Sequence, residues 1–151
     1  MSLDVDVTTN GIRTSVGRVG LADAARAALR AERIGNALLS VTLLDRAGIA
    51  RMNRRHLDHA GATDVISFGF ARATPRDPVI GDIYICPDIA RANAKERGVS
   101  PREELVRLVV HGTLHVLGYD HPESDDRERS EMWRRQERVV RRLAARGRVA
   151  R

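Results

Sequence analysis

Apolar and polar residues follow two different periods along the chain. Four segments show the alternating or continuously apolar, β-branched pattern of strands, and five show apolar residues at helical spacing. The strands are expected at residues 3–9, 36–45, 64–70 and 79–87. The helices are expected at residues 20–35, 46–57, 87–98, 100–118 and 122–146. Because helices and strands interleave, we predict an α/β (α+β) fold, in which a small, mostly four-stranded mixed sheet packs with about five helices in a single domain of residues 1–151.

Residues with capping or turn preferences mark several helix ends. Ser100 and Glu103 have the spacing of a capping box, which predicts the start of the helix that ends near Gly118. Gly98 follows the preceding helix, where a left-handed residue commonly ends a helix. Ser124 is expected to cap the last helix.

The helix expected at residues 101–117 is apolar around most of its circumference, which is typical of a buried helix. At about 100° per residue, one narrow polar stripe remains. It consists of Glu104, Arg107, His111 and His115. Two histidines on the polar stripe of a buried helix face either a cleft or each other. Their spacing of one helical turn brings both rings within reach of a single ion.

A third histidine can return to the same place. Gly118 is the residue type that ends a helix in the left-handed conformation, so we predict a positive φ there. His121 precedes Pro122, which favours an extended backbone at the histidine. We therefore predict that His111, His115 and His121 bind one Zn²⁺ per chain and leave a fourth position for water.

Two other interpretations of the histidine cluster remain open. A structural cluster of partly charged histidines would place like charges together in a buried setting and needs compensation. A closed structural zinc site needs a fourth ligand, which Asp120 or Asp125 can supply. If Asp120 is not a ligand, we expect its carboxylate to support a ligand histidine.

The spacing H-x-x-x-H-x-x-G-x-x-H is also that of the metzincin proteases, with one difference. Those enzymes carry a glutamate directly after the first histidine as general base. Here that position is Gly112. Because a peptide hydrolase without its base loses much of its rate, the sequence argues against peptide hydrolysis. A metallohydrolase that acts on another substrate stays an alternative.

The charge of the chain bears on its partner. The net charge is +6, and Lys95 is the only lysine among the basic residues. Such a surplus favours an anionic partner such as nucleic acid, although an arginine bias of the genome explains it equally well. Much of the charge lies in residues 134–151, whose eight arginines indicate a solvated helix face and chain end. Aromatic residues make up 3% of the chain, so base stacking is expected to contribute little to any binding of nucleic acid.

The composition also bears on the cellular compartment. Cys86 is the only cysteine, which excludes an internal disulfide and fits a reducing cytoplasm. No apolar run approaches the roughly 20 residues that span a bilayer, and the acidic start of the chain is unlike a secretory signal. We therefore expect a cytoplasmic protein without a membrane partner.

Residues 111–121, HGTLHVLGYDH, resemble the signature of the YbeY endoribonuclease family. Three shorter motifs follow the order of that family, namely RMNRRHL, TDVISF and GDIYI, which begin at residues 51, 63 and 81. The resemblance covers roughly residues 40–125. It implies a compact α/β fold and a zinc ion on three histidines, which correspond to His111, His115 and His121.

The resemblance also implies an activity and partners. It implies a single-strand-specific, zinc-dependent endoribonuclease in 16S rRNA 3′-end maturation and ribosome quality control. Single-stranded rRNA, the small ribosomal subunit and its assembly factors are the partners implied. The sequence assigns no further catalytic residue.

One departure from the family pattern concerns substrate binding. The family usually carries an arginine four residues after the asparagine of the RMNRRHL motif, and that arginine is thought to contact RNA; the position is Leu57 here. Arg54, Arg55 and Arg107 are the candidates to replace it, because a guanidinium suits phosphate oxygens. The departure gives weight to a second function, that of a non-catalytic assembly factor which binds pre-rRNA.

Overall fold

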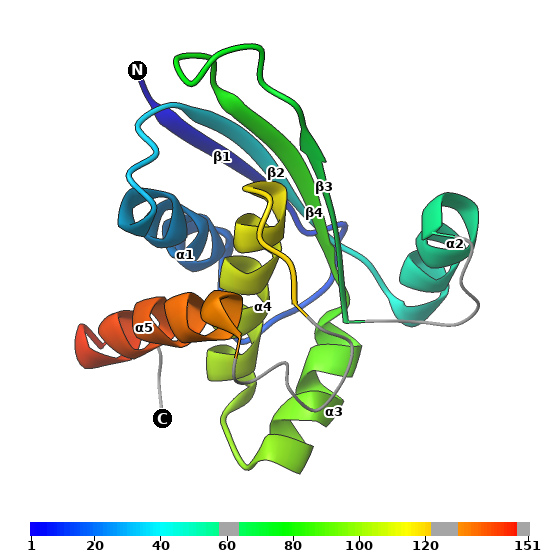
Figure 1. The fold of residues 1–151 in the computed structure, drawn as a ribbon. Coiled ribbons are helices and arrows are strands. Elements are labelled where there is room, and N and C mark those ends of the chain that lie inside the picture. Colours follow the sequence, from blue (N-terminus) through cyan, green and yellow to red (C-terminus); the bar gives the residue numbers. More distant parts are fainter. Residues whose placement is uncertain (58–63, 122–129, 148–151) are drawn as a thin grey trace.

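Four strands form one mixed sheet in the computed structural model of the protein, which describes residues 1–57, 64–121 and 130–147. The strands are β1 (Leu3–Thr8), β2 (Ala37–Leu43), β3 (Val65–Phe70) and β4 (Val79–Ile85). They lie in the order β1-β2-β4-β3 (Figure 1). β1 and β4 run parallel to β2, and β3 runs antiparallel to β4. The predicted small mixed sheet is therefore confirmed.

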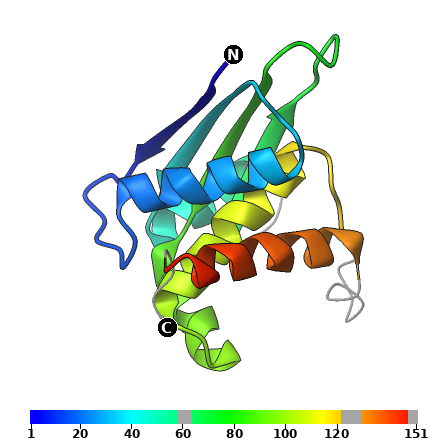
Figure 2. The ribbon, with the colours of Figure 1, turned by 90° about the vertical axis from the view of Figure 1, so that its left-hand side faces the viewer.

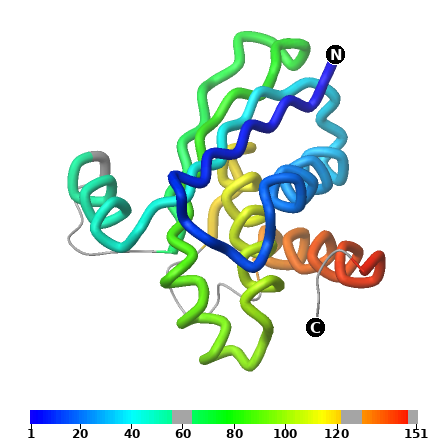
Figure 3. The backbone as a smooth tube through the Cα atoms, turned by 180° about the vertical axis from the view of Figure 1, so that it is seen from behind, coloured from blue at the N-terminus to red at the C-terminus, as the bar shows by residue number. Residues whose placement is uncertain are grey.

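Five helices surround this sheet in the described part of the chain. They are α1 (Arg18–Ala31), α2 (Arg46–Leu57), α3 (Pro87–Arg97), α4 (Pro101–Val116) and α5 (Glu131–Ala145). α1, α4 and α5 lie on one side of the sheet (Figures 1 and 2), whereas α2 stands on the other side (Figure 3). The predicted α/β class and number of helices are confirmed within these ranges. No helix among them is both long and apolar enough to cross a membrane.

The alternation in the strands decides which face of the sheet the helices cover. In β2, Ala37, Leu39, Val41 and Leu43 are at most 2% exposed, whereas Leu38, between the first two, is 53% exposed. β4 repeats this pattern, with a buried residue at every second position. Because successive side chains of a strand point to opposite faces, one apolar face packs against α1 and α4 and forms the core.

α4 is the central helix, and eleven of its sixteen residues are buried. Ser100 caps it as predicted, accepting a hydrogen bond from the backbone N–H of Glu103 at 3.1 Å. The last turn lies so close to β3 that a Cβ on Gly69 would come within 2.5 Å of the Val116 carbonyl oxygen. Glycine permits this approach of strand and helix backbones. The sheet thereby fixes the end of the helix that carries two of the three histidines.

The boundaries of two helices differ from the sequence-based expectation. α1 begins and ends earlier than the expected residues 20–35. Gly20 lies inside it, where an added Cβ would come within 2.8 Å of the Val16 side chain, so this glycine serves packing rather than helix initiation. Ser130, rather than Ser124, caps α5. Ser124 lies outside the described residues.

Candidate metal centre

Three histidine side chains converge near the C-terminal end of α4. His111 and His115 belong to the helix, and His121 follows it after a short turn. Their ring centroids lie 4.6 to 5.0 Å apart. One nitrogen of each ring lies within 4.8 Å of those of the other two. The convergence expected from the spacing is therefore present, and all three rings are half-buried rather than enclosed in the core.

Gly118 makes the turn that brings His121 back to the helix. Its φ is +100°, which confirms the predicted left-handed conformation. Its N–H donates to the carbonyl oxygen of His115 at 2.9 Å, and the N–H of Tyr119 donates to that of Leu114 at 3.0 Å. The turn thus supplies partners for carbonyl groups that the end of α4 would leave without one.

Replacing Gly118 with valine should weaken zinc binding about tenfold although no ligand is altered. An added Cβ would meet no atom within 4 Å, so the cost is that of the backbone conformation. A left-handed conformation costs an L-residue roughly 1–2 kcal/mol, and its relaxation would move His121 away. Titration calorimetry with zinc measures the change.

Gly98→Val is the matched control for this substitution. Gly98 also has a left-handed backbone and open space around its Cα, but it ends α3. Its replacement should lower stability without changing zinc affinity. An unchanged affinity in Gly118→Val, or an equal loss in Gly98→Val, would show that the turn does not position His121.

Two of the histidine rings have an oxygen atom within hydrogen-bond distance of Nδ1, and this leaves Nε2 to face the centre of the cluster. His111 Nδ1 lies 2.5 Å from Gln136 Oε1, and His115 Nδ1 lies 2.9 Å from the carbonyl oxygen of Tyr119. The Gln136 amide is oriented by its own Nε2, which donates to Glu137 at 2.9 Å. Because both oxygens only accept, each neutral ring carries its proton on Nδ1 and keeps the lone pair on Nε2. Both helix histidines are thus arranged to bind a metal through Nε2.

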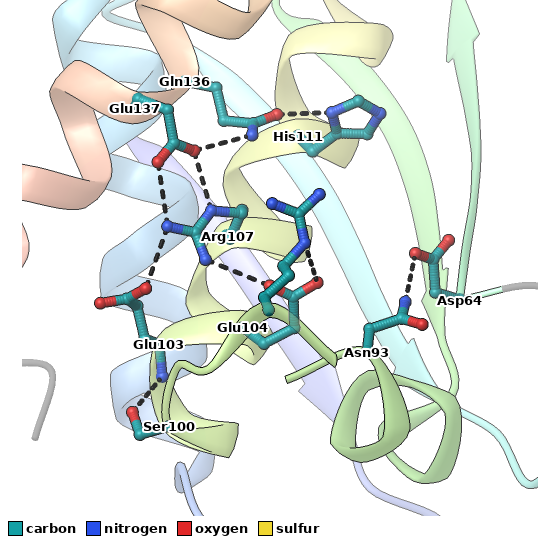
Figure 4. A network of polar contacts seen from close by, with 10 residues as sticks. Asp64, Asn93, Ser100, Glu103, Glu104, Arg107, His111, Gln136 and Glu137 are labelled. Carbon is teal, nitrogen blue, oxygen red and sulfur yellow. Dashed lines mark hydrogen bonds and ion pairs between the residues drawn. The ribbon is translucent and has the colours of Figure 1, made fainter. Parts of the chain in front are cut away.

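Arg107 belongs to a largely buried ion-pair network that adjoins Gln136, the partner of His111 (Figure 4). Its guanidinium donates to Glu137 at 2.8 and 2.9 Å, to Glu103 at 3.0 Å and to Glu104 at 3.1 Å. Burial alone would lower the pKa of Arg107, but hydrogen bonds to these three carboxylates raise it above its usual value. Four of its five N–H donors, which the sequence suggested for RNA phosphate, are therefore used inside the protein. Arg107 is connected to His111 through Glu137 and Gln136, and it lines the same cavity as the histidines.

The pKa values of two carboxyl groups in this network, Glu137 and Glu104, are shifted in opposite directions. Burial by itself would raise the pKa of Glu137, but hydrogen bonds from Arg107 and Gln136 bring it below its usual value. Burial raises the pKa of Glu104 above its usual value, against the opposing attraction of Arg97 and Arg107. Glu137 therefore stays ionised at neutral pH and keeps the Gln136 amide in the orientation that His111 requires.

Asp120 holds the turn that precedes His121. Its side chain is exposed, and the carboxylate accepts a hydrogen bond from the backbone N–H of His121 at 2.9 Å. In the described part of the chain, the converging group of ligand-type side chains consists of the three histidines and does not include Asp120. Asp125, the other candidate for a fourth ligand, lies outside the described residues. The position of Asp120 thus fits a role in shaping the turn.

Gly112 points toward the sheet and not toward the histidines. A Cβ at this position would lie 2.8 Å from Cγ2 of Ile83 and 3.4 Å from Cγ2 of Val65. A glutamate, which is larger still, would force α4 away from β4. The fold therefore explains why the residue after the first histidine is small, and it separates this site from a metzincin-like arrangement with a base at that position.

The histidines line a cavity of about 970 Å³ that reaches to three other helices. Asn53 of α2, Arg97 of α3 and Trp133 of α5 also line it. Arg54 and Arg55 adjoin Asn53 on α2 and are exposed to solvent; the side chain of Leu57 lies outside the description. The residues that line the cavity come from segments far apart in sequence. No local sequence pattern therefore indicated that Trp133 and Gln136 belong to the cavity wall.

The donor set fits a zinc ion. Three imidazoles are a common ligand set for zinc and leave one position open to water or substrate. Hydrogen bonds from Nδ1 to an oxygen are the usual support for such ligands, and His111 and His115 have them. The cluster can therefore hold a metal ion at the wall of a cavity large enough for a polar ligand.

Comparisons with known proteins agree on one family. The family model described as Endoribonuclease YbeY matches residues 8–144, a longer span than the motifs alone. A Frankia alni protein of that name is 38% identical over 136 residues, which cover 83% of this chain and 74% of the relative. An Acidothermus cellulolyticus protein of the same name is 40% identical over 122 residues, which cover 73% of this chain and 74% of the relative.

A solved structure agrees with these relatives. The solution structure of a Thermotoga maritima protein superposes with a TM-score of 0.64 at 26% identity, covering 95% of this chain and 91% of that one. The sequence match, the motif order and the fold thus point the same way. This chain belongs to the endoribonuclease YbeY family.

Proposed function

We propose that this protein is a zinc-dependent endoribonuclease that cuts single-stranded RNA. The observation that carries the proposal is the convergence of His111, His115 and His121 at the wall of a cavity lined by polar side chains. Membership in a family named for endoribonucleases supports RNA as the substrate. In the cell, the proposed substrate is 16S rRNA at its 3′ end, during maturation and ribosome quality control in the cytoplasm, with the small subunit and assembly factors as partners.

The three histidines would hold one zinc ion per chain. When bound, such an ion supplies Lewis-acid chemistry that activates water and polarises a phosphoryl oxygen. Gln136 and the Tyr119 carbonyl keep the protons of His111 and His115 on Nδ1, which leaves Nε2 of each ring available. Gly112 provides no acid or base at the position that carries the general base in metzincins, and the role assigned to the cavity wall is to bind and orient the RNA beside the histidines.

Arginines outside the buried network would hold the RNA backbone. Arg54 and Arg55 are exposed on α2, next to Asn53 in the cleft wall. Arg97 lines the cleft itself and is partly exposed. We assign the phosphate contacts to these side chains rather than to Arg107, whose hydrogen-bond donors point to Glu103, Glu104 and Glu137.

Zinc-loaded protein should cut a single-stranded RNA that contains the 3′ end of 16S rRNA and should leave a duplex of the same sequence intact. A chelator should stop cleavage, and added zinc should restore it. Gel analysis of end-labelled RNA measures both effects. Tight RNA binding without cleavage would favour the assembly-factor alternative, and cleavage that persists in the chelator would exclude a role for the metal.

A further inference from the structure

We propose that Trp133 and Arg97 form a subsite in the cleft that binds one unpaired nucleobase together with its adjoining phosphate. The inference deepens the proposed function, because it rests on RNA as the ligand. It concerns a step before chemistry, namely how a single strand is held beside the histidines. It can therefore be tested by binding alone.

The position of Trp133 argues for a ligand contact. It is the only tryptophan of the chain, and its side chain is half-buried and lines the same cavity as the three histidines. Its neighbours on the core side of α5, Met132 and Gln136, are each 1% exposed. Ser130 accepts a hydrogen bond from the Trp133 backbone N–H at 3.2 Å, which fixes the first turn of the helix. A large aromatic ring is thus held at the cleft wall, partly accessible, rather than in the core.

Arg97, the last residue of α3, lies next to the Trp133 ring. Its guanidinium carbon lies 5.1 Å from the centre of the Trp133 ring. Its Nε lies 3.7 Å from Oε2 of Glu104, whose side chain is 3% exposed, while the Arg97 side chain is 37% exposed. A buried carboxylate therefore anchors one edge of the guanidinium beside the indole. A guanidinium has five N–H donors, and among the described residues Glu104 is the carboxylate paired with this one, so donors remain for a phosphate.

The chemistry of this pair selects an unpaired base. Aromatic rings and guanidinium planes bind bases by stacking, which tolerates any sequence because every base has a π face. A base within a duplex is already stacked on its neighbours and does not reach such a surface. The low aromatic content predicted little stacking, but the position of the single indole matters more than the number of aromatic residues.

The test uses metal-free protein, so that the RNA is bound and not cut. A fluorescein-labelled single strand of about ten nucleotides is compared with an abasic strand of the same length and charge. Anisotropy gives affinity, and the fluorescence of the only tryptophan reports the subsite directly. We expect the base-bearing strand to bind more tightly and to quench Trp133, and we expect the abasic strand to leave the fluorescence unchanged.

Substitutions separate the aromatic from the cationic part. Trp133→Leu should weaken binding of the base-bearing strand about tenfold and leave the abasic strand unaffected, with Trp133→Phe in between. Arg97→Gln should lower the salt dependence for both strands by about one unit. Phe70→Leu is the matched control, because Phe70 is 59% exposed on β3 and does not belong to the cavity lining.

Two results would overturn the subsite. One is equal quenching of Trp133 by both strands, and the other is an equal affinity of the parent for both strands; each is read on the parent and does not depend on a variant that folds. If either result is found and zinc-loaded protein still cuts RNA, the subsite fails while the proposed function stands. Base-dependent quenching without cleavage would support the subsite and refute the nuclease.

Discussion

A variant that carries His111→Ala and His115→Ala should bind no zinc, whereas the parent should hold one ion per chain. The two substitutions remove the Nε2 atoms that Gln136 and the Tyr119 carbonyl leave available. His121 would remain as the only ligand, and zinc sites of this type need three from the protein. Elemental analysis of purified protein measures the metal, and RNA cleavage should be lost with it.

The fold of this variant should persist, because both rings are half-buried at the cleft wall and not in the core. Asn93→Ala is a suitable control. Asn93 lines the same cleft and donates to Asp64 at 3.0 Å, but it is not part of the converging group. It should keep its zinc. Full occupancy in the double variant would refute the histidine site, and loss of zinc from both proteins would point to a collapsed cleft.

Replacing Arg107 with methionine should destabilise the protein by about 3–5 kcal/mol, because removing one partner of a buried ion pair leaves the other charges uncompensated. Arg107 and its partner Glu104 are 8% and 2% exposed. Glu103 and Glu137 form ion pairs with the same guanidinium. Methionine keeps much of the volume and removes the charge. Urea denaturation of parent and variant measures the difference.

The pH dependence of this effect identifies its cause. Without Arg107, the partly desolvated carboxyls of Glu104 and Glu137 should have folded-state pKa values above the unfolded value of about 4.3. A carboxyl of this kind contributes stability below its unfolded pKa and loses it as the pH rises through the folded pKa. The variant should therefore recover stability as the pH falls through these raised folded-state pKa values toward about 4.3. In the parent, Glu137 has a lowered pKa, so its contribution is present above about pH 4.3 and is lost as the pH falls through the folded value.

Two comparisons separate the network from a surface effect and from RNA binding. Arg91→Met removes an ion pair with Asp88 in which both side chains are more than half exposed, and it should change stability little. Arg107→Met should also leave the salt dependence of RNA binding as in the parent. A decrease of this salt dependence by about one unit would instead support the direct contact between Arg107 and an RNA phosphate that the sequence suggested.

The sequence by itself determined the elements and the histidine cluster, because both depend on local geometry. The one-turn spacing of His111 and His115 places two rings on one face of any helix. Gly118 ends that helix in a conformation that other residues avoid. His121 lies three residues further on, so the whole cluster is built within eleven residues, and its convergence could be predicted without knowledge of the fold.

Only the tertiary structure decided which side chains of other elements contact α4 and the histidine cluster. A helical wheel places Arg107 on the polar stripe of α4, but it does not show that Glu137, thirty residues later, meets it there. Three other contacts are of the same kind. They join Gln136 to His111, Ile83 to Gly112 and Trp133 to Arg97. Each depends on how α5, α3 and the sheet pack against α4, and that packing is determined by the burial of apolar surface throughout the core, which no short segment of the chain encodes.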